Sequence, residues 1–334
     1  MNLFTHVNAQ TVAEASTALA KGKTRVIAGG TDLLCYLRNM CSPNPPSVVV
    51  NLKTISPSLA YIKEEGGLLK IGATTTLAAI AASALVKGNY AALAQAALEV
   101  ASPELRNTGT IGGNICQKVR CPYFRFEYNE FPCLRKNPTG LCYALTGVNT
   151  THSIFGAVNG CVATMPSDIA PVLVAMNANI VTNKKTWKAA DFFVMPAVND
   201  VRREQINALD ADEVVTEIQV PTPPAGTKST YVKWSFRKAI DFPNVSAAVM
   251  ATTAAGAISS ASIVLGGVYG YPRVAAGAQD AIRGKAIDAT TAAAAGEAAA
   301  TGSTALPAPG GTPTNKYKIQ ITKVMVKRAL LAVK

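Results

Sequence analysis

Two glycine pairs, Gly29-Gly30 and Gly112-Gly113, constrain the fold of this chain more than any other feature. The first pair follows a β-type run and precedes a helical segment, where a backbone can approach a ligand and free amides attract phosphate. Neither pair belongs to a GxGxxG or Walker motif, and each alone also fits an ordinary turn. Asp32 would repel an anion here unless its carboxylate turned away to cap the helix. Taken together, the two turns predict a site that binds one extended dinucleotide from both sides.

The residues around the first pair predict a small βαβ-like unit. Apolar residues at helical spacing indicate a helix over 12–19. A β-type run at 25–28, a helix that opens at Asp32 and a valine run at 48–50 complete the unit.

The middle of the chain continues as a mixture of strands and helices. A strand is expected at 68–71, followed by two alanine-rich helices, one of which has an apolar face over 90–98. Beyond a cysteine-rich region, apolar spacing over 169–176 predicts a helix that Ser167 or Asp168 can cap.

The C-terminal third is set apart by a Pro/Gly-rich linker at 221–226. The uncharged stretch 242–272 is interrupted by prolines and glycines, so it predicts paired buried strands and not a membrane span. The expected elements are strands at 232–236, 245–253 and 262–268 and helices near 275–300 and 320–333. The N-terminus lacks the pattern of a signal peptide, so we expect a cytoplasmic protein, or a periplasmic one exported with a signal-bearing partner.

Charge and histidine content limit the classes of function. A net charge of +12 favours acidic partners and leaves nucleic acid, an acidic subunit and an anionic cofactor open. His6 and His152 are too few for a three-histidine zinc centre, and neither stands near a nucleophile elbow such as GxSxG. Base-assisted acyl transfer is therefore disfavoured.

Five of the seven cysteines lie in a long segment that carries no confident helix or strand. Their spacing, C-x4-C-x11-C-x8-C-x18-C, matches neither a zinc ribbon nor the compact ferredoxin run. Such a loop can fold four thiolates around a cubane cluster, but ordinary thiols are equally compatible with the spacing, and disulfides are disfavoured in a reducing cytosol. These cysteines are Cys116, Cys121, Cys133, Cys142 and Cys161.

Arginines and aromatic residues alternate within the same segment. Arg120, Arg125 and Arg135 stand among Tyr123, Phe124 and other aromatic residues, a composition that suits either single-stranded nucleic acid or a protein interface. Because recognised nucleic-acid motifs are missing, we favour docking of a partner subunit and expect no nucleic-acid partner.

Four segments resemble the FAD-binding medium subunit of molybdenum hydroxylases, in register over nearly the whole chain. They are AGGTDLL at 28–34, ASPELRNTGTIGGN at 101–114, PSDIAPVLVAMNA at 166–178 and YVKWSFRKAIDFPNVSAAV at 231–249. The resemblance implies an α+β fold: a PCMH-type FAD-binding domain at 1–224, with subdomains of about 1–57 and 58–224, and a C-terminal α/β domain at 225–334 like that of CO dehydrogenase flavoproteins.

The resemblance also implies the site residues. The FAD-binding residues would be Ile27, Ala28, Gly29, Gly30, Thr31, Asp32 and Leu33 in the first turn, Thr110, Gly113 and Asn114 in the second, Asp168 on the ribose or adenine side, and Cys116 in the flavin wall. The long insertion at about 115–162 resembles that of members with an additional [4Fe-4S] cluster, closest to bacterial aldehyde oxidoreductases. By that likeness the ligands are Cys121, Cys133, Cys142 and Cys161, with Cys116 in reserve.

The expected function is therefore electron transfer within a heterotrimeric, molybdenum-containing aldehyde oxidoreductase. Electrons would pass from a large molybdenum-cofactor subunit through a small [2Fe-2S] subunit to FAD in this chain, and from there to an external acceptor. The expected alternatives are a related xanthine, CO or hydroxybenzoyl-CoA enzyme, a free-standing flavoenzyme, and a basic RNA-binding protein with a structural metal.

Overall fold

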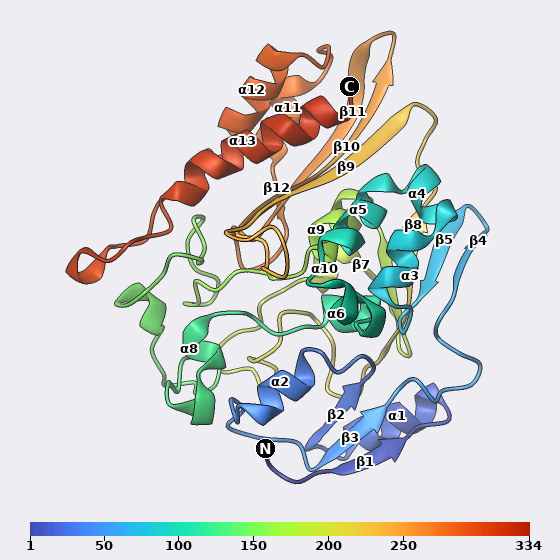
Figure 1. Cartoon of the computed structure of the whole chain (residues 1–334), viewed down its shortest axis with the longest axis vertical. Helices are drawn as coiled ribbons and strands as arrows, with labels where there is room; N and C mark the ends of the chain where they lie inside the picture. Colours follow the sequence, from blue (N-terminus) through green and yellow to red (C-terminus); the bar gives the residue numbers. More distant parts are fainter.

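Three separate β-sheets divide the chain, and the computed structural model describes all of residues 1–334. A small parallel sheet lies at one end, a five-stranded sheet in the middle and a four-stranded sheet with its helices at the other end (Figure 1). This mixed architecture confirms the α+β fold expected from the sequence.

The N-terminal sheet has the order β1-β3-β2 and contains the predicted βαβ unit. Its elements are β1 (Thr5–Asn8), α1 (Val12–Ala20), β2 (Thr24–Ile27), α2 (Leu33–Arg38) and β3 (Val48–Asn51). Helix α1 begins where the Thr11 hydroxyl accepts the Glu14 N–H at 3.1 Å. Ala15 of α1 and Val50 of β3 are buried in the same small apolar core, which holds the helix on the sheet.

The central sheet is antiparallel, with the order β4-β5-β8-β6-β7. Its strands are β4 (Ile62–Glu65), β5 (Leu68–Gly72), β6 (Asn179–Thr182), β7 (Thr186–Lys188) and β8 (Val215–Pro221). The helices around it are α3 (Leu77–Ala82), α4 (Ala84–Asn89), α5 (Ala91–Glu99), α6 (Pro103–Thr108), α7 (Ile111–Ile115), α9 (Ile169–Ala175) and α10 (Ala189–Phe192). Leu69, Ile71, Ile218 and Val220 are buried in the main core.

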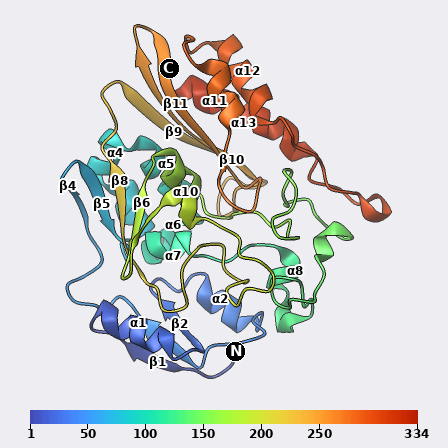
Figure 2. The ribbon, with the colours of Figure 1, turned by 180° about the vertical axis from the view of Figure 1, so that it is seen from behind.

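The cysteine-rich segment is largely irregular, as its sequence predicted. It contains only the short helix α8 (Pro122–Arg125) and the single turns η1 (Glu127–Asn129) and η2 (Tyr143–Leu145). It runs along one side of the molecule, between α2 and the C-terminal segment (Figure 2). We call residues 116–161 the cysteine loop.

The C-terminal sheet has the order β12-β11-β10-β9 and is covered by helices on both faces. Its elements are β9 (Thr227–Trp234), β10 (Val245–Ala254), β11 (Ala257–Gly266), β12 (Arg273–Val274), α11 (Ala276–Ile282), α12 (Ala289–Ala299), η3 (Pro309–Gly311) and α13 (Tyr317–Ala332). Ala248 packs into the central core, while its neighbours Ala247 and Val249 pack under the C-terminal helices. Because both faces of this sheet are buried, the stretch 242–272 that forms its middle strands carries no charge.

One expectation about local structure needs correction, and one open alternative is decided. Strands β9 and β11 begin earlier than predicted, because their first halves, TKST and AISSA, are rich in polar residues and lack a continuous apolar run. At the start of α9 the capping group is the Ser167 hydroxyl, which accepts the Ala170 N–H at 3.0 Å, whereas the Asp168 side chain makes no cap bond.

No helix of this chain combines the length and apolar character needed to cross a bilayer.

Candidate functional site

The first glycine turn contacts Thr108 and Gly109, which lead directly into the second turn. A Cβ atom at Gly29 would collide with the Thr108 carbonyl oxygen and lie 2.9 Å from the Gly109 Cα. Gly109 in turn lies beside the Thr31 hydroxyl. Only a residue without a side chain lets the first turn approach this segment so closely, so the fold brings the two turns into one region.

The glycines at these turns are required for different reasons. Gly30 has φ +71°, a left-handed conformation that side chains disfavour. At Gly112 a Cβ would lie 2.8 Å from the Ala73 carbonyl oxygen, so this glycine allows close backbone packing. Gly113 is exposed, and a Cβ there would meet only the Thr110 hydroxyl, at 3.1 Å. Packing within the chain therefore accounts for Gly112 but leaves Gly113 open to a ligand.

Asp32 is turned away from the first turn, but not to cap α2 as the sequence suggested. Its carboxylate forms ion pairs with Arg125 at 2.6 Å and Arg120 at 2.9 Å and accepts the Lys118 N–H at 2.9 Å. Burial alone would raise the pKa of this carboxyl, but the two guanidinium groups hold the pKa of Asp32 below its ordinary value. The neutralised carboxylate does not oppose an anion at the turn.

The second turn is tied to the PSD motif. The Asn114 side-chain oxygen accepts a hydrogen bond from the Ser167 hydroxyl, and Thr110 caps α7 by accepting the Gly113 N–H at 3.2 Å. Asp168, the next residue of the motif, is 2% exposed. These contacts bring four candidate residues, Thr110, Gly113, Asn114 and Asp168, from two distant segments into one region.

Both carboxylate oxygens of Asp168 are engaged by the C-terminal domain. One oxygen accepts a hydrogen bond from the Tyr231 hydroxyl, and the other forms an ion pair with the Lys233 ammonium at 3.1 Å. Burial raises the pKa of Asp168 to about 6, against the lowering effect of Lys233 and Tyr231. Sequence reasoning did not select Lys233, although it lies in the YVKW segment that carried the resemblance.

The remaining first-turn candidates surround Gly29 and Gly30. Ile27, Ala28, Thr31 and Leu33 are all half-buried. Cys116 lies at the end of α7, and burial raises the pKa of its thiol to about 12. It does not line the pocket that the other four cysteines of the loop share.

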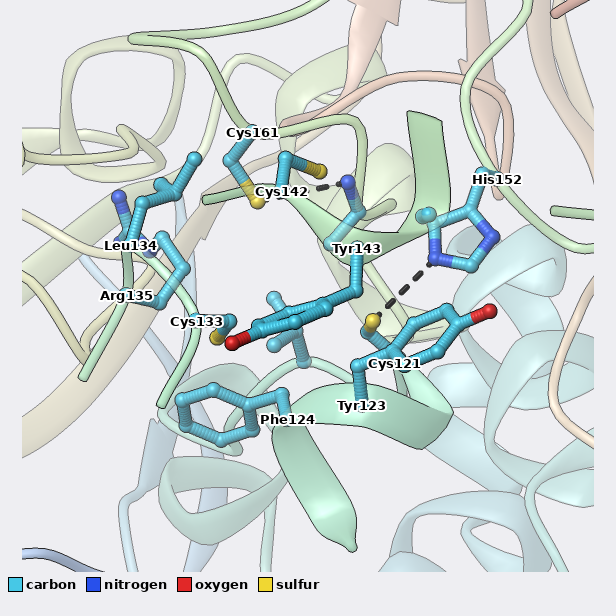
Figure 3. Close-up of a pocket in the computed structure, with 13 residues that line it drawn as sticks. Cys121, Tyr123, Phe124, Cys133, Leu134, Arg135, Cys142, Tyr143, His152 and Cys161 are labelled. Atoms are coloured by element: carbon cyan, nitrogen blue, oxygen red, sulfur yellow. Dashed lines mark hydrogen bonds between the residues drawn. The ribbon is translucent and has the colours of Figure 1, made fainter. Parts of the chain in front are cut away.

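Cys121, Cys133, Cys142 and Cys161 line one pocket of the cysteine loop (Figure 3). His152 lines it too, with its Nε2 atom 3.3 Å from the Cys121 sulfur, and the Tyr143 ring projects into the same space. The thiols are free, so the disulfide alternative is not realised here. No group of three or more His, Cys, Asp or Glu side chains is gathered closely enough to bind a single metal ion.

Two buried cations accompany this pocket. Arg135 is 1% exposed and donates to the carbonyl oxygens of Pro196, at 2.7 Å, and Gln205. Lys136 is buried and its Nζ atom has no hydrogen-bond partner. Burial lowers the pKa of Lys136, with the thiol of Cys133 opposing the shift. An unpaired buried ammonium is costly, so this side chain keeps its charge only beside a negative group.

This donor set fits an iron–sulfur cluster better than a single ion. A cubane binds each of four thiolates to a different iron, so its ligands need not converge on one point. Four thiolates on such a cluster leave net negative charge, which the cations Arg135 and Lys136 can offset. The pocket residues therefore fit the expected group.

The arginines of the loop all have acceptors within the chain. Arg120 and Arg125 are held by Asp32, and Arg135 is buried against backbone carbonyls. Docking of a partner by this segment stays a prediction, and the exposed aromatic and apolar residues are its best candidates. The loop does expose apolar groups, and Tyr128 and Leu141 are 72% and 73% exposed.

Comparison with known proteins gives two family matches. A family described as "FAD binding domain in molybdopterin dehydrogenase" matches residues 2–223, and one described as "CO dehydrogenase flavoprotein C-terminal domain" matches residues 230–333. Together they span nearly the whole chain.

Individual relatives agree with these matches. The chain is 32% identical to the aldehyde oxidoreductase FAD-binding subunit PaoB of Escherichia coli, over 81% of this chain and 83% of the relative. It is 28% identical to the carbon monoxide dehydrogenase medium chain of Afipia carboxidovorans, over 98% and 95% of the two chains. A solved structure of carbon monoxide dehydrogenase from Hydrogenophaga pseudoflava superposes with a TM-score of 0.75 at 26% identity, covering 99% of this chain and 97% of the other.

Proposed function

This chain belongs to the FAD-binding medium subunits of molybdenum hydroxylases, and from that premise we propose that it is the FAD- and [4Fe-4S]-carrying electron-transfer subunit of an aldehyde oxidoreductase. Its partners would be a large subunit with the molybdenum cofactor and a small subunit with [2Fe-2S] clusters. Bound FAD would accept electrons from the small subunit and release them to an external acceptor. The residues of this chain would bind and orient the groups and tune their potentials.

The close approach of the two glycine turns carries the FAD part of the proposal. Gly29 is pressed against the turn at Thr108 and Gly109, and Gly113 next to that turn remains exposed. A pyrophosphate needs a backbone that it can approach from more than one side, and this pair of turns supplies one. The buried pair Asp168–Lys233 then fixes the C-terminal domain against the PSD motif beside the second turn.

The cluster part rests on the cysteine pocket. Cys121, Cys133, Cys142 and Cys161 would hold the cluster, with Arg135 and Lys136 as buried counter-charges. Such cations favour the more negative, reduced state and so raise the reduction potential. The choice of an aldehyde as substrate of the complex rests on the likeness to the aldehyde oxidoreductase subunit of Escherichia coli.

The proposal is tested by purifying the chain from its native host, with no affinity tag on any other chain, and by identifying the chains that copurify with it. We expect flavin absorbance bands with a broad iron–sulfur shoulder, together with a molybdenum-containing large chain and a small iron–sulfur chain. Because the small chain brings iron of its own, the cluster is judged by the iron beyond its [2Fe-2S] content: no such excess would refute the [4Fe-4S] cluster, and a protein that purifies alone would refute the heterotrimer.

The ligand set is tested by comparing Cys142→Ala with Cys116→Ala. Cys142 lines the pocket and Cys116 does not. We expect the first variant to lose the cluster iron and keep most of its FAD, and the second to keep the iron. Full iron content in Cys142→Ala would overturn the assignment.

A further inference from the structure

His152 lies in the interior of the cysteine loop, although nothing in its sequence context predicts that position. The residue is 2% exposed, and its Nε2 atom lies 3.3 Å from the Cys121 sulfur. Its Nδ1 atom is buried and has no hydrogen-bond partner. The Nε2 atom thus has one hydrogen-bond partner, and that partner is a proposed ligand sulfur (Figure 3).

The backbone of His152 is fixed by side chains from the C-terminal domain. Its carbonyl oxygen accepts hydrogen bonds from Lys318 Nζ at 2.9 Å and from Asn315 Nδ2 at 3.2 Å. Lys318 is fully buried and also donates to the carbonyl oxygens of Thr151, at 2.9 Å, and Gly267, at 2.6 Å. A buried ammonium that donates to three carbonyls holds them rigidly, since moving any of them leaves one of its N–H groups without an acceptor.

The proposed ligand role of Cys121 selects the tautomer of the ring, because a cluster-bound thiolate carries no proton and can only accept. A buried N–H without an acceptor is less readily tolerated than a buried acceptor without a donor. With its proton on Nε2, His152 directs its only N–H at the Cys121 sulfur and leaves only the Nδ1 lone pair unpartnered. This assignment follows from the hydrogen-bond network.

We infer that His152 is a positioning and tuning residue for the cluster: its Nε2–H donates to the Cys121 sulfur, and Lys318 and Asn315 hold it there. The inference rests on the proposed function, because it requires Cys121 to be a cluster ligand. A donor to a ligand sulfur stabilises the state with more negative charge. Adding one electron to the cluster increases that charge, so the hydrogen bond raises the reduction potential.

The test compares full-length protein with three single substitutions. His152→Leu removes the donor, and His152→Gln keeps an N–H at nearly the same reach. His6→Leu repeats the first substitution at the only other histidine, which is exposed on β1. Iron per chain is measured first, and the midpoint potential is then obtained by a redox titration followed by electron paramagnetic resonance.

We expect all three variants to retain iron. His152→Leu should disfavour reduction about tenfold, which is a fall of about 59 mV for a one-electron couple. His152→Gln should recover most of that loss, and His6→Leu should match the unsubstituted chain.

Three results would overturn the inference. An unshifted potential in His152→Leu would show that the ring does not act on the sulfur. Loss of iron from both His152 variants would make His152 an iron ligand. An unsubstituted chain without iron would refute the proposed cluster itself, and that failure is distinguishable because it precedes any comparison of variants.

Discussion

Gly113→Ala separates the demands of the fold from the demands of a ligand. A methyl group at this position meets only the Thr110 hydroxyl, at 3.1 Å, and no backbone atom. Gly113 has no positive φ and lies in α7, so alanine suits its backbone. The protein itself should accept the change, and only a ligand seated on the turn should resist it.

The size of the effect follows from what the methyl group displaces. A pyrophosphate seated on this backbone would be pushed away and lose at least one hydrogen bond to a charged group, which is worth about 1.5–3 kcal/mol. Since about 1.4 kcal/mol is tenfold in affinity, the dissociation constant of FAD should rise about 10- to 150-fold. The FAD-free protein should be as stable as the unsubstituted one, or more stable by up to about 1 kcal/mol.

The assay combines FAD titration of the FAD-free chain, followed by flavin fluorescence, with thermal unfolding of the same preparation. Gly88→Ala is the matched control, because that glycine also lies in a helix and a Cβ there meets nothing within 4 Å. It should leave FAD affinity unchanged. If Gly113→Ala bound FAD as tightly as the control, the second turn would not contact the cofactor.

Three further substitutions probe the frame around the turns. Gly29→Ala should force the two turns apart, cost about 1–3 kcal/mol in the FAD-free protein and weaken FAD binding; unchanged thermal unfolding would contradict the packing argument. Asp32→Asn should cost about 1.5–3 kcal/mol at neutral pH. The pKa of Asp32 is lowered in the folded protein below its ordinary value of 3.8, so this deficit should decrease below pH 3.8 and vanish once the pH has fallen below the folded pKa. A deficit independent of pH in denaturant titrations would exclude an ion-pair origin. Lys233→Met should cost about 3–5 kcal/mol by leaving Asp168 buried and unpaired. Lys233 lowers the pKa of Asp168, which burial raises to about 6, so in the variant this pKa should lie higher; the deficit should therefore shrink as the pH falls toward 6 and stay constant below it, and a deficit that grew instead would refute the reasoning.

Most of the fold could be predicted from the sequence, because buried helices and strands leave periodic apolar patterns. The helix at α1 and the strands β3 and β10 are examples. Strand β1 was not predicted, since all four of its residues are exposed and its pairing with β3 is decided by the rest of the sheet. Local patterns carry no information about such pairings.

The candidate site was only partly predictable for the same reason. The glycine turns and the cysteines can be found as motifs, but the partners of Asp32 are two arginines far along the chain. His152 looked like an ordinary loop histidine, and its contact with Cys121 depends on Lys318 and Asn315 in the last helical region. Long-range contacts of this kind require the tertiary structure.

The cysteine loop is anchored twice, and this explains why loss of the cluster should spare FAD. Its first part is fixed to α2, where Arg125 pairs with Asp32 and the Phe124 ring stacks on Tyr36 with centroids 5.5 Å apart. Its later part is fixed elsewhere, by Lys318 and by Arg135. The arginines that neutralise Asp32 beside the first glycine turn therefore precede Cys142 in the chain, and their ion pairs do not depend on it. A Cys142→Ala chain that lost iron and FAD together would show that the two anchors act as one.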